Sequence, residues 1–140
     1  MDKTRESLRV EEAVRRHDAG YNCCQAVACT FADCVGIDEE TMYRLTEGFG
    51  LGMGNMNGVC GAFSAVALIV GLASSNGDTA NAGKTKAATY KKVAAMQEEF
   101  TKRAERLICR DIKKGNNGGA FTSCDDCVRI AAALLEDFFS

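Results

Sequence analysis

Two cysteines near the C-terminus, Cys124 and Cys127, form a CxxC motif, the local pattern with the clearest chemistry in this sequence. A spacing of three residues places both sulfur atoms on one face of a helix, within reach of one metal ion or of each other. The intervening residues, Asp125 and Asp126, are acidic, and their charge favours a bound cation over a free thiolate. The motif therefore indicates metal binding or redox chemistry.

The surrounding sequence excludes two common uses of such a motif. The chain contains no proline, so it lacks the cis-proline of thioredoxin-like proteins, and no strand–helix–strand pattern surrounds the motif. His17 is the only histidine and does not follow the CxxC, which excludes covalent attachment of a c-type haem. The motif belongs to another architecture.

Three of the eight cysteines, Cys23, Cys60 and Cys124, fall in the first turn of predicted helices. Free backbone N–H groups and the helix dipole stabilise negative charge there, so these positions lower the pKa of a thiol. Thiolate is both the nucleophilic and the metal-binding form of cysteine. The three positions favour either nucleophilic redox chemistry or metal ligation.

The remaining cysteines of the second predicted helix are expected to be structural. Cys23 and Cys34 lie eleven residues apart, about 16 Å along an intact helix, so they cannot meet at one centre. For Cys24, Cys29 and Cys34 we predict the role of small buried hydrophobic residues.

The glycine-rich stretch GFGLGMGNMNG (48–58) precedes Cys60. It lacks the GxGxxG spacing and the lysine of a phosphate-binding loop, which argues against nucleotide binding. Its glycines can bring backbone close to another element and expose N–H groups near the cysteine, so Gly58 and Gly61 are candidate cofactor-binding positions. The alternative is a tight connection between two core helices.

The elements that must position these residues are predicted to be helices, since apolar residues recur with helical periodicity and no sustained alternation indicates a strand. We expect an all-α fold, one domain over residues 1–140, built as a bundle of about five to six helices around a buried apolar central helix. Cys109 is predicted near the C-terminal end of a long helix. The predicted helices span residues 3–18, 22–36, 38–48, 59–73, 84–112 and 123–139. Asn22 with Gln25, and Ser123 with Asp126, are predicted to cap the starts of the second and the last of them.

Composition narrows the classes of function. Seventeen basic and nineteen acidic side chains give a net charge of −2, which argues against nucleic acid as a partner. The N-terminal residues contain no apolar signal region, so a cytoplasmic location is expected. The longest apolar run, 59–73, is shorter than the roughly 20 residues that cross a bilayer, and we predict a chain that does not span a membrane. In a reducing compartment, many cysteines indicate metal binding, redox activity or burial.

Four stretches together resemble the C_GCAxxG_C_C family of redox-active proteins: GYNCCQA from Gly20, FGLGMGNMNGVCGA from Phe49, CRDI from Cys109 and CDDCVRIAAALLE from Cys124. The resemblance implies a small helical protein whose redox activity is inferred and whose four characteristic cysteines are Cys23, Cys60, Cys109 and Cys124. It also extends to part of the split-Soret cytochromes, which implies a scaffold able to hold an iron–sulfur centre. Ala65 replaces the last glycine of the CGAxxG motif.

We therefore expect Cys23, Cys60, Cys109 and Cys124, with Cys127 as an optional fifth thiol, to converge near one end of the central helix. The favoured function is cysteine-based redox chemistry, by an oxidoreductase or an electron carrier that meets an unidentified partner protein. A thiol/disulfide couple needs no cofactor, whereas four thiolates favour slightly an iron–sulfur or other cysteine-ligated centre. The alternative is a non-catalytic binding module held by a structural four-cysteine zinc site. The oligomeric state, including a homo-oligomer, stays open.

Overall fold

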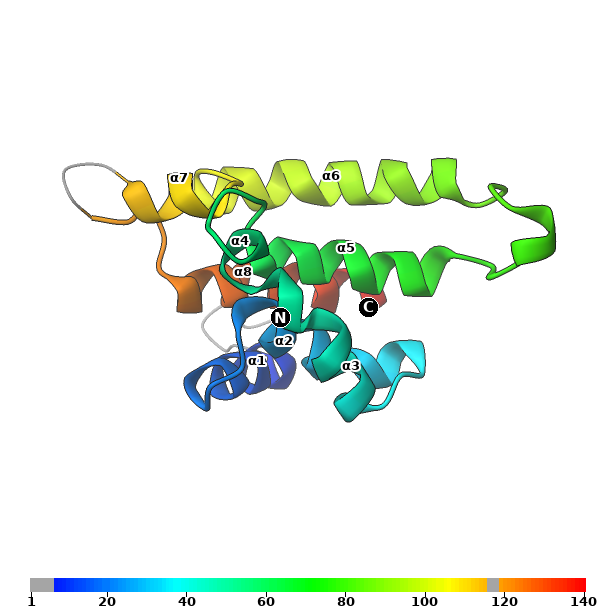
Figure 1. Cartoon of the computed structure of the whole chain (residues 1–140), viewed down its shortest axis with the longest axis horizontal. Coiled ribbons are helices and arrows are strands. Elements are labelled where there is room, and N and C mark those ends of the chain that lie inside the picture. Colours follow the sequence, from blue (N-terminus) through cyan, green and yellow to red (C-terminus); the bar gives the residue numbers. More distant parts are fainter. Residues whose placement is uncertain (1–6, 116–118) are drawn as a thin grey trace.

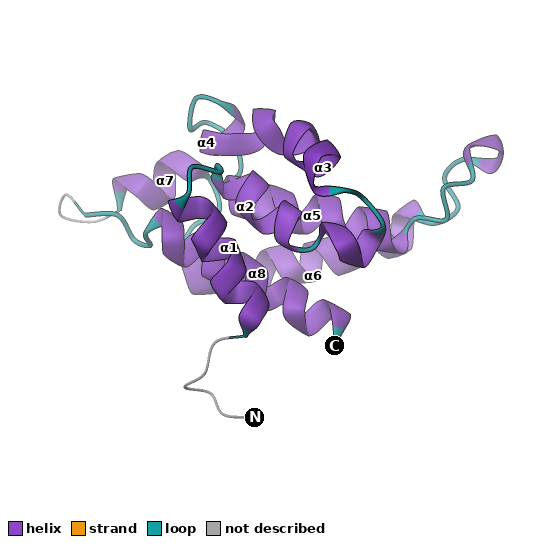
Figure 2. Cartoon of the chain, turned by 90° about the horizontal axis from the view of Figure 1, so that it is seen from below, coloured by secondary structure: helices purple, strands orange, loops and turns teal. Residues whose placement is uncertain are grey.

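The computed structural model describes residues 7–115 and 119–140, and within them the chain is helical. These residues contain no β-strand, only one isolated antiparallel bridge between Val59 and Ile108. The prediction of one all-α domain is confirmed (Figures 1 and 2). The helices are α1 (Leu8–Asp18), α2 (Cys23–Thr30), α3 (Glu39–Thr46), α4 (Gly50–Met53), α5 (Gly61–Ser74), α6 (Lys86–Ala104), α7 (Cys109–Lys114) and α8 (Cys124–Phe139), with 3₁₀ turns at Ala32–Val35, Glu47–Phe49 and Thr79–Asn81.

Helix α5 is the centre of the fold, as the uncharged run in the sequence predicts. Its sequence carries no charged side chain, and α2, α6 and α8 pack against it. Val66, Ile69 and Val70 of this helix are fully buried in one core with Phe100 and Leu135. Burial of each such side chain contributes about 1.5–3 kcal/mol to folding. None of the described helices is long and apolar enough to cross a membrane.

Several helices begin at the same end of the molecule. Figure 1 shows α4, α7 and the beginnings of α5 and α8 at this end, whereas the connection between α5 and α6 extends from the opposite end. Side-chain caps define two of the helix starts, as predicted. Asn22 and Gln25 form a complete capping box at α2, and the Ser123 hydroxyl accepts the N–H of Asp126 at α8.

The predicted long helix over residues 84–112 is wrong. Helix α6 ends at Ala104, because Glu105 adopts a left-handed conformation with φ of 75°, and α7 starts afresh at Cys109. Between them the backbone bonds to the segment before α5 through the Val59–Ile108 bridge. Those bonds replace the intrahelical ones, so Cys109 begins a helix instead of standing near the end of one.

Two other predicted boundaries change. Helix α2 stops at Thr30, well before Gly36, and a 3₁₀ turn follows it. The guanidinium of Arg9 donates to the carbonyl oxygen of Thr30 at 2.7 Å and satisfies one of the free carbonyls at the helix end. Helix α1 begins at Leu8 with Ser7 as its N-cap, and the start predicted for it lies outside the described residues.

Candidate functional site

A cavity of about 220 Å³ at the gathered helix starts is lined by all five cysteines that the sequence singles out. Cys23, Cys109 and Cys124 are the first residues of α2, α7 and α8, and Cys60 is the N-cap residue of α5. Cys127 lies one turn further along α8. The structure thus brings these residues together, and their catalytic or metal-binding role stays a prediction.

Backbone hydrogen bonds hold Cys60 beside Cys109. The N–H of Cys60 donates to the carbonyl of Leu107, and the N–H of Cys109 donates to the carbonyl of Gly58, both at 2.9 Å. These bonds flank the Val59–Ile108 bridge. Two cysteines that are 49 residues apart in the numbering of the chain are therefore fixed as neighbours by main-chain atoms.

Arg110 fastens the glycine-rich stretch to the start of α7. Its N–H donates to the carbonyl of Met56 at 2.8 Å, and its guanidinium donates to the side chain of Asn57 and to the carbonyl of Asn55, both at 3.0 Å. These three bonds anchor the loop on the side of the cavity where Cys109 lies.

Two glycines allow the cavity wall to close. A Cβ at Gly52 would lie 2.4 Å from the Cβ of Cys109, and the φ of Gly52 is +56°. A Cβ at Gly61 would lie 2.9 Å from the carbonyl oxygen of Phe49 and 3.3 Å from the backbone nitrogen of Cys24. Close packing at these two positions brings α4 against α7, and α5 against α2.

Gly58 also allows close packing of the cavity wall. Its N–H donates to the carbonyl of Gly52 at 2.9 Å, and a Cβ on it would meet the side chain of Met53 at 2.4 Å. That N–H is already engaged within the protein. The cofactor-binding role predicted for Gly58 and Gly61 stays a prediction.

Cys23 and Cys124 form a thiol–thiolate pair at the cavity. Hydrogen bonding from the Cys23 thiol lowers the pKa of Cys124 to about 5, against the opposing effect of burial, and the charge of Lys113 also lowers it. The same interaction, together with burial, raises the pKa of Cys23 far above its ordinary value. At neutral pH the pair carries one negative charge, on Cys124.

Cys60 and Cys127 form a second pair of the same kind. The Cys127 thiol and the backbone N–H groups of Ala62 and Phe63 lower the pKa of Cys60, against the effect of burial. The interaction with Cys60 and burial raise the pKa of Cys127. Burial, followed by the charge of Cys60, raises the pKa of Cys109.

The arrangement of the sulfur atoms bears on metal binding. A tetrahedral zinc ion holds sulfur at about 2.3 Å, which places the sulfur atoms roughly 3.8 Å apart. Among the described residues, no three cysteine sulfurs lie within 4.8 Å of one another; the one group that meets this criterion is His17, Asp18 and Asp125. The cysteines interact two by two instead of meeting at one point, so as arranged they do not form a single-ion site.

The sequence model of a family described as "Putative redox-active protein (C_GCAxxG_C_C)" matches residues 21–138. The chain belongs to this family. No curated protein and no solved structure matches the chain. The family description agrees with the prediction of a redox-active, cysteine-rich protein, and the matched residues include every cysteine of the chain.

The other three cysteines lie outside this family site. Cys24 is fully buried and does not line the cavity, and Cys29 is buried as well. Cys34 is exposed, so the prediction of burial is wrong for this residue, because α2 ends at Thr30 and the following turn reaches the surface. Of the two adjacent cysteines at the start of α2, Cys23 is the one that lines the cavity.

Sequence reasoning missed two residues that line the cavity and carry or can carry positive charge, Lys113 and His17. His17 is the only histidine of the chain and lies before the residues that the family match covers, so the family pattern does not point to it. Lys113 was not recognised because residues 84–112 were predicted to form one long helix. In the structure α7 begins at Cys109, and Lys113 on this helix faces the thiolates.

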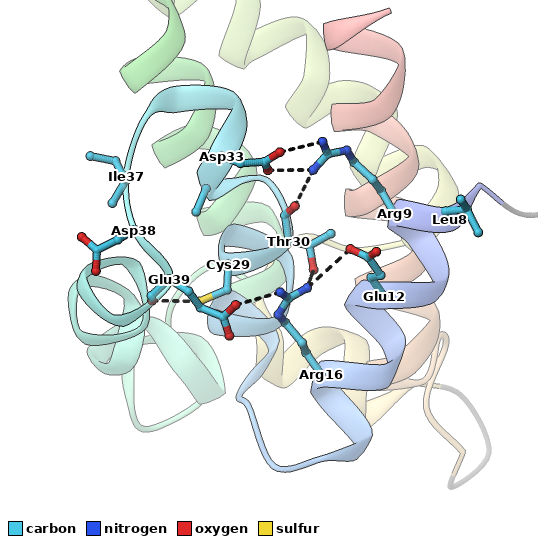
Figure 3. A pocket seen from close by; sticks show the side chains of 11 residues that line it. Leu8, Arg9, Glu12, Arg16, Cys29, Thr30, Asp33, Ile37, Asp38 and Glu39 are labelled. Atoms are coloured by element: carbon cyan, nitrogen blue, oxygen red, sulfur yellow. Dashed lines mark hydrogen bonds and ion pairs between the residues drawn. The ribbon is translucent and has the colours of Figure 1, made fainter.

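A second, larger cavity of about 560 Å³ lies between α1, the end of α2 and the start of α3, and its charges are paired (Figure 3). Arg9 forms two hydrogen bonds with Asp33, at 2.8 and 2.9 Å, and Arg16 donates to Glu39 at 2.9 Å. Cys29 points to the same cavity, with its thiol 3.8 Å from the carbonyl of Glu39. Because both arginines of its lining are bonded to carboxylates and cannot stabilise a thiolate as Lys113 does, this cavity is not the candidate site.

Proposed function

We propose that this member of the C_GCAxxG_C_C family carries out thiol–disulfide redox chemistry through Cys124 and Cys23. The observation that supports the proposal is the placement of the two cysteines, which begin α8 and α2 and lie together at the half-buried edge of a cavity, where the Cys23 thiol lowers the pKa of Cys124. Cys60, Cys109 and Cys127 are buried. The half-buried pair is therefore the one that a disulfide from outside meets first.

Cys124 is the attacking residue in this proposal. Its pKa of about 5 makes it a thiolate at neutral pH, and its place at the first residue of α8 adds the stabilisation of a helix N-terminus. Lys113 stabilises the same charge. A thiolate is the form of cysteine that attacks a disulfide.

The reaction balances with a partner disulfide R–S–S–R′ as the oxidant. The Cys124 thiolate attacks one sulfur, forms a mixed disulfide with R–S and releases R′–S⁻. The Cys23 sulfur, after losing its proton, attacks the Cys124 sulfur and releases R–S⁻. Two electrons pass from the two cysteines to the partner, and the reverse sequence reduces the protein again.

Site-resolved alkylation tests the assignment. The protein is purified without oxygen and treated with limiting iodoacetamide between pH 5 and pH 9, and each cysteine is quantified by peptide mass spectrometry. We expect Cys124 to be alkylated first at pH 6. Cys34 is exposed as a residue, but partial burial of its thiol raises its pKa, so it should react later. Faster alkylation of Cys34 than of Cys124 at pH 6 would contradict the proposal.

Metal analysis of the same preparation decides between the alternatives. Metal-free, colourless protein that forms a Cys23–Cys124 disulfide with glutathione disulfide supports the proposal. Stoichiometric iron with broad visible absorbance would overturn it in favour of a cysteine-ligated centre. Stoichiometric zinc with unreactive cysteines would overturn it in favour of a structural module.

A further inference from the structure

His17, in the last turn of α1, contacts groups on two other helices at the edge of the cysteine cavity. Its Nδ1 lies 2.5 Å from a carboxylate oxygen of Asp125, the residue after Cys124 on α8. Its Nε2 lies 3.7 Å from the sulfur of Cys23 on α2. A carboxylate, an imidazole and a thiol are thus arranged in series.

The order of these groups determines the role of each ring nitrogen. An ionised carboxylate only accepts hydrogen bonds, so Nδ1 of the neutral imidazole carries the hydrogen that is donated to Asp125. Nε2 is then the acceptor, and it faces the Cys23 thiol. A nucleophile, a base and a carboxylate that orients the base form the arrangement found wherever a side-chain nucleophile is activated by a neighbour.

We propose that His17 is the general base that removes the proton from Cys23 when Cys23 closes the disulfide onto Cys124, and that Asp125 is a positioning residue that holds its tautomer. This inference rests on the proposed thiol–disulfide function. It adds to the family cysteines a residue that lies before the matched range of the family.

The resolving step needs such a base. In the reduced protein the hydrogen bond to Cys124 and burial both raise the pKa of Cys23, and burial still raises it once Cys124 is in a mixed disulfide, so the thiol needs a group that takes its proton. Once Cys124 is in a mixed disulfide, the Cys23 proton moves to Nε2 of His17, the Cys23 sulfur bonds to the Cys124 sulfur, and R–S⁻ leaves. The imidazolium then holds one positive charge beside Asp125, and it can return the proton to the leaving thiolate.

The groups that face His17 come from each element around it. Asp18 belongs to its own helix, Cys23 to α2, Lys113 to α7, and Asp125 with Cys124 to α8. One carboxylate oxygen each of Asp18 and Asp125 and one ring nitrogen of His17 lie within 4.8 Å of one another.

The test separates the two steps with 5,5′-dithiobis(2-nitrobenzoic acid), which releases one coloured thiolate when Cys124 attacks and a second when Cys23 resolves the mixed disulfide. Reduced protein in a Cys34→Ala background is mixed with the reagent in a stopped-flow instrument at pH 8. The pKa of Cys124 in the unsubstituted protein, about 5, is well below this pH, and several groups lower it, so we expect the thiolate to stay the main form when His17 is replaced. We expect His17→Asn to leave the first release within about threefold and to slow the second about 100-fold, the usual contribution of a general base.

Two further variants complete the experiment. Asp125→Asn keeps His17 but can donate to Nδ1, which favours the wrong tautomer, so the second release should slow about tenfold or more. Arg15→Gln, an exposed substitution on α1, is the matched control and should leave both releases unchanged. Far-UV circular dichroism and intact first-phase rates show that each variant is folded.

The pH dependence adds a readout that a merely structural role would not change. Between pH 7 and pH 9 the second release in His17→Asn should rise with pH as Cys23 itself ionises, and it should rise more steeply than in the unsubstituted protein, where His17 takes the proton. If the unsubstituted protein shows no second release, the proposed function fails. If it shows both releases and His17→Asn does not slow the second, only the role of His17 is overturned.

Discussion

The two cavities at the two ends of α2 each contain a cysteine next to charged side chains, and the two thiols are in opposite states. Burial, and then the carboxylate of Glu39, raise the pKa of Cys29 to about 11. The Cys23 thiol, and then the positive charge of Lys113, lower the pKa of Cys124 to about 5. A hydrogen bond from a second thiol therefore favours one thiolate, burial disfavours the other, and the neighbouring charges add to both differences.

In the larger cavity, the positive charge next to the thiol is bonded to other groups. Arg16 lies near Cys29 and lowers its pKa, but its guanidinium is already bonded to Glu39 and to the Thr30 hydroxyl. Paired arginines brace α1 against α2 and α3, and the thiol beside them stays neutral. In the cysteine cavity the positive groups face sulfur instead.

The wall of the cysteine cavity depends on close backbone contact, whereas the larger cavity is held by side-chain ion pairs. A glycine substitution in the wall of the cysteine cavity should therefore have the largest effect of these predictions. Gly52→Ala places a methyl group against Cys109 and adds left-handed strain, and we expect a loss of about 3 kcal/mol in the free energy of unfolding. Gly77→Ala, where φ is +68° and nothing lies within 4 Å, is the control and should cost about 1 kcal/mol. Urea unfolding measures both, and equal losses would contradict the close-contact argument.

Serine substitutions compare the two thiols directly. At pH 7 Cys124 is almost entirely thiolate, whereas Cys29 is thiolate in about one molecule in 10⁴. The lower pKa of Cys124 makes its thiolate intrinsically less nucleophilic than that of Cys29, by about 10³-fold. The two effects together leave Cys124 about tenfold faster than Cys29. In the Cys34→Ala background, which removes the exposed thiol, Cys124→Ser should therefore lower the initial rate with a disulfide reagent about tenfold. Cys29→Ser should leave it unchanged. Similar losses from both would mean that the cavities do not differ in reactivity.

Removal of the lysine charge should make Cys124 more like Cys29. The ammonium of Lys113 favours the thiolate, so Lys113→Gln raises the pKa of Cys124. The alkylation rate of Cys124 should fall severalfold at pH 6 and be unchanged at pH 9, where the thiol is ionised in either protein. Lys114→Gln, one residue further along α7, is the control. A rate that falls equally at both pH values would indicate altered access instead of altered charge.

The smallest effect is expected in the charged cavity. Arg9→Gln breaks the pair with Asp33, which is largely exposed, so the free energy of unfolding should fall by about 0.5–1 kcal/mol without any change in thiol reactivity. The arginine lowers the pKa of Asp33, so this stability is present at neutral pH and is lost as the pH falls and the carboxylate becomes protonated. Urea unfolding at pH 7 and pH 3 measures the difference, which should be smaller at pH 3, where Asp33 is partly protonated and the bond from Arg9 to the Thr30 carbonyl remains. If Cys124 reacted more slowly in this variant, the expected independence of the two cavities would be contradicted.

Local signals in the sequence were sufficient wherever the structure depends on local interactions. Asn22 with Gln25, and Ser123 at the start of α8, cap their helices as predicted, because a capping side chain bonds to backbone only two or three residues away. The uncharged run 59–73 predicted the central helix, because a helix without charge must be buried. These features placed Cys23, Cys60 and Cys124 at helix starts.

The sequence by itself determined the all-α class, the central helix and the set of cysteines, since periodicity, caps and residue types act over a few residues. Only the tertiary structure decided that Cys109 begins a helix, that Cys23 pairs with Cys124 and Cys60 with Cys127, and that His17 reaches Cys23. Each of these depends on contact between segments far apart in the chain, such as the bridge between Val59 and Ile108. Such contacts exist only after the helices have packed, because packing against α5 sets which helix ends meet.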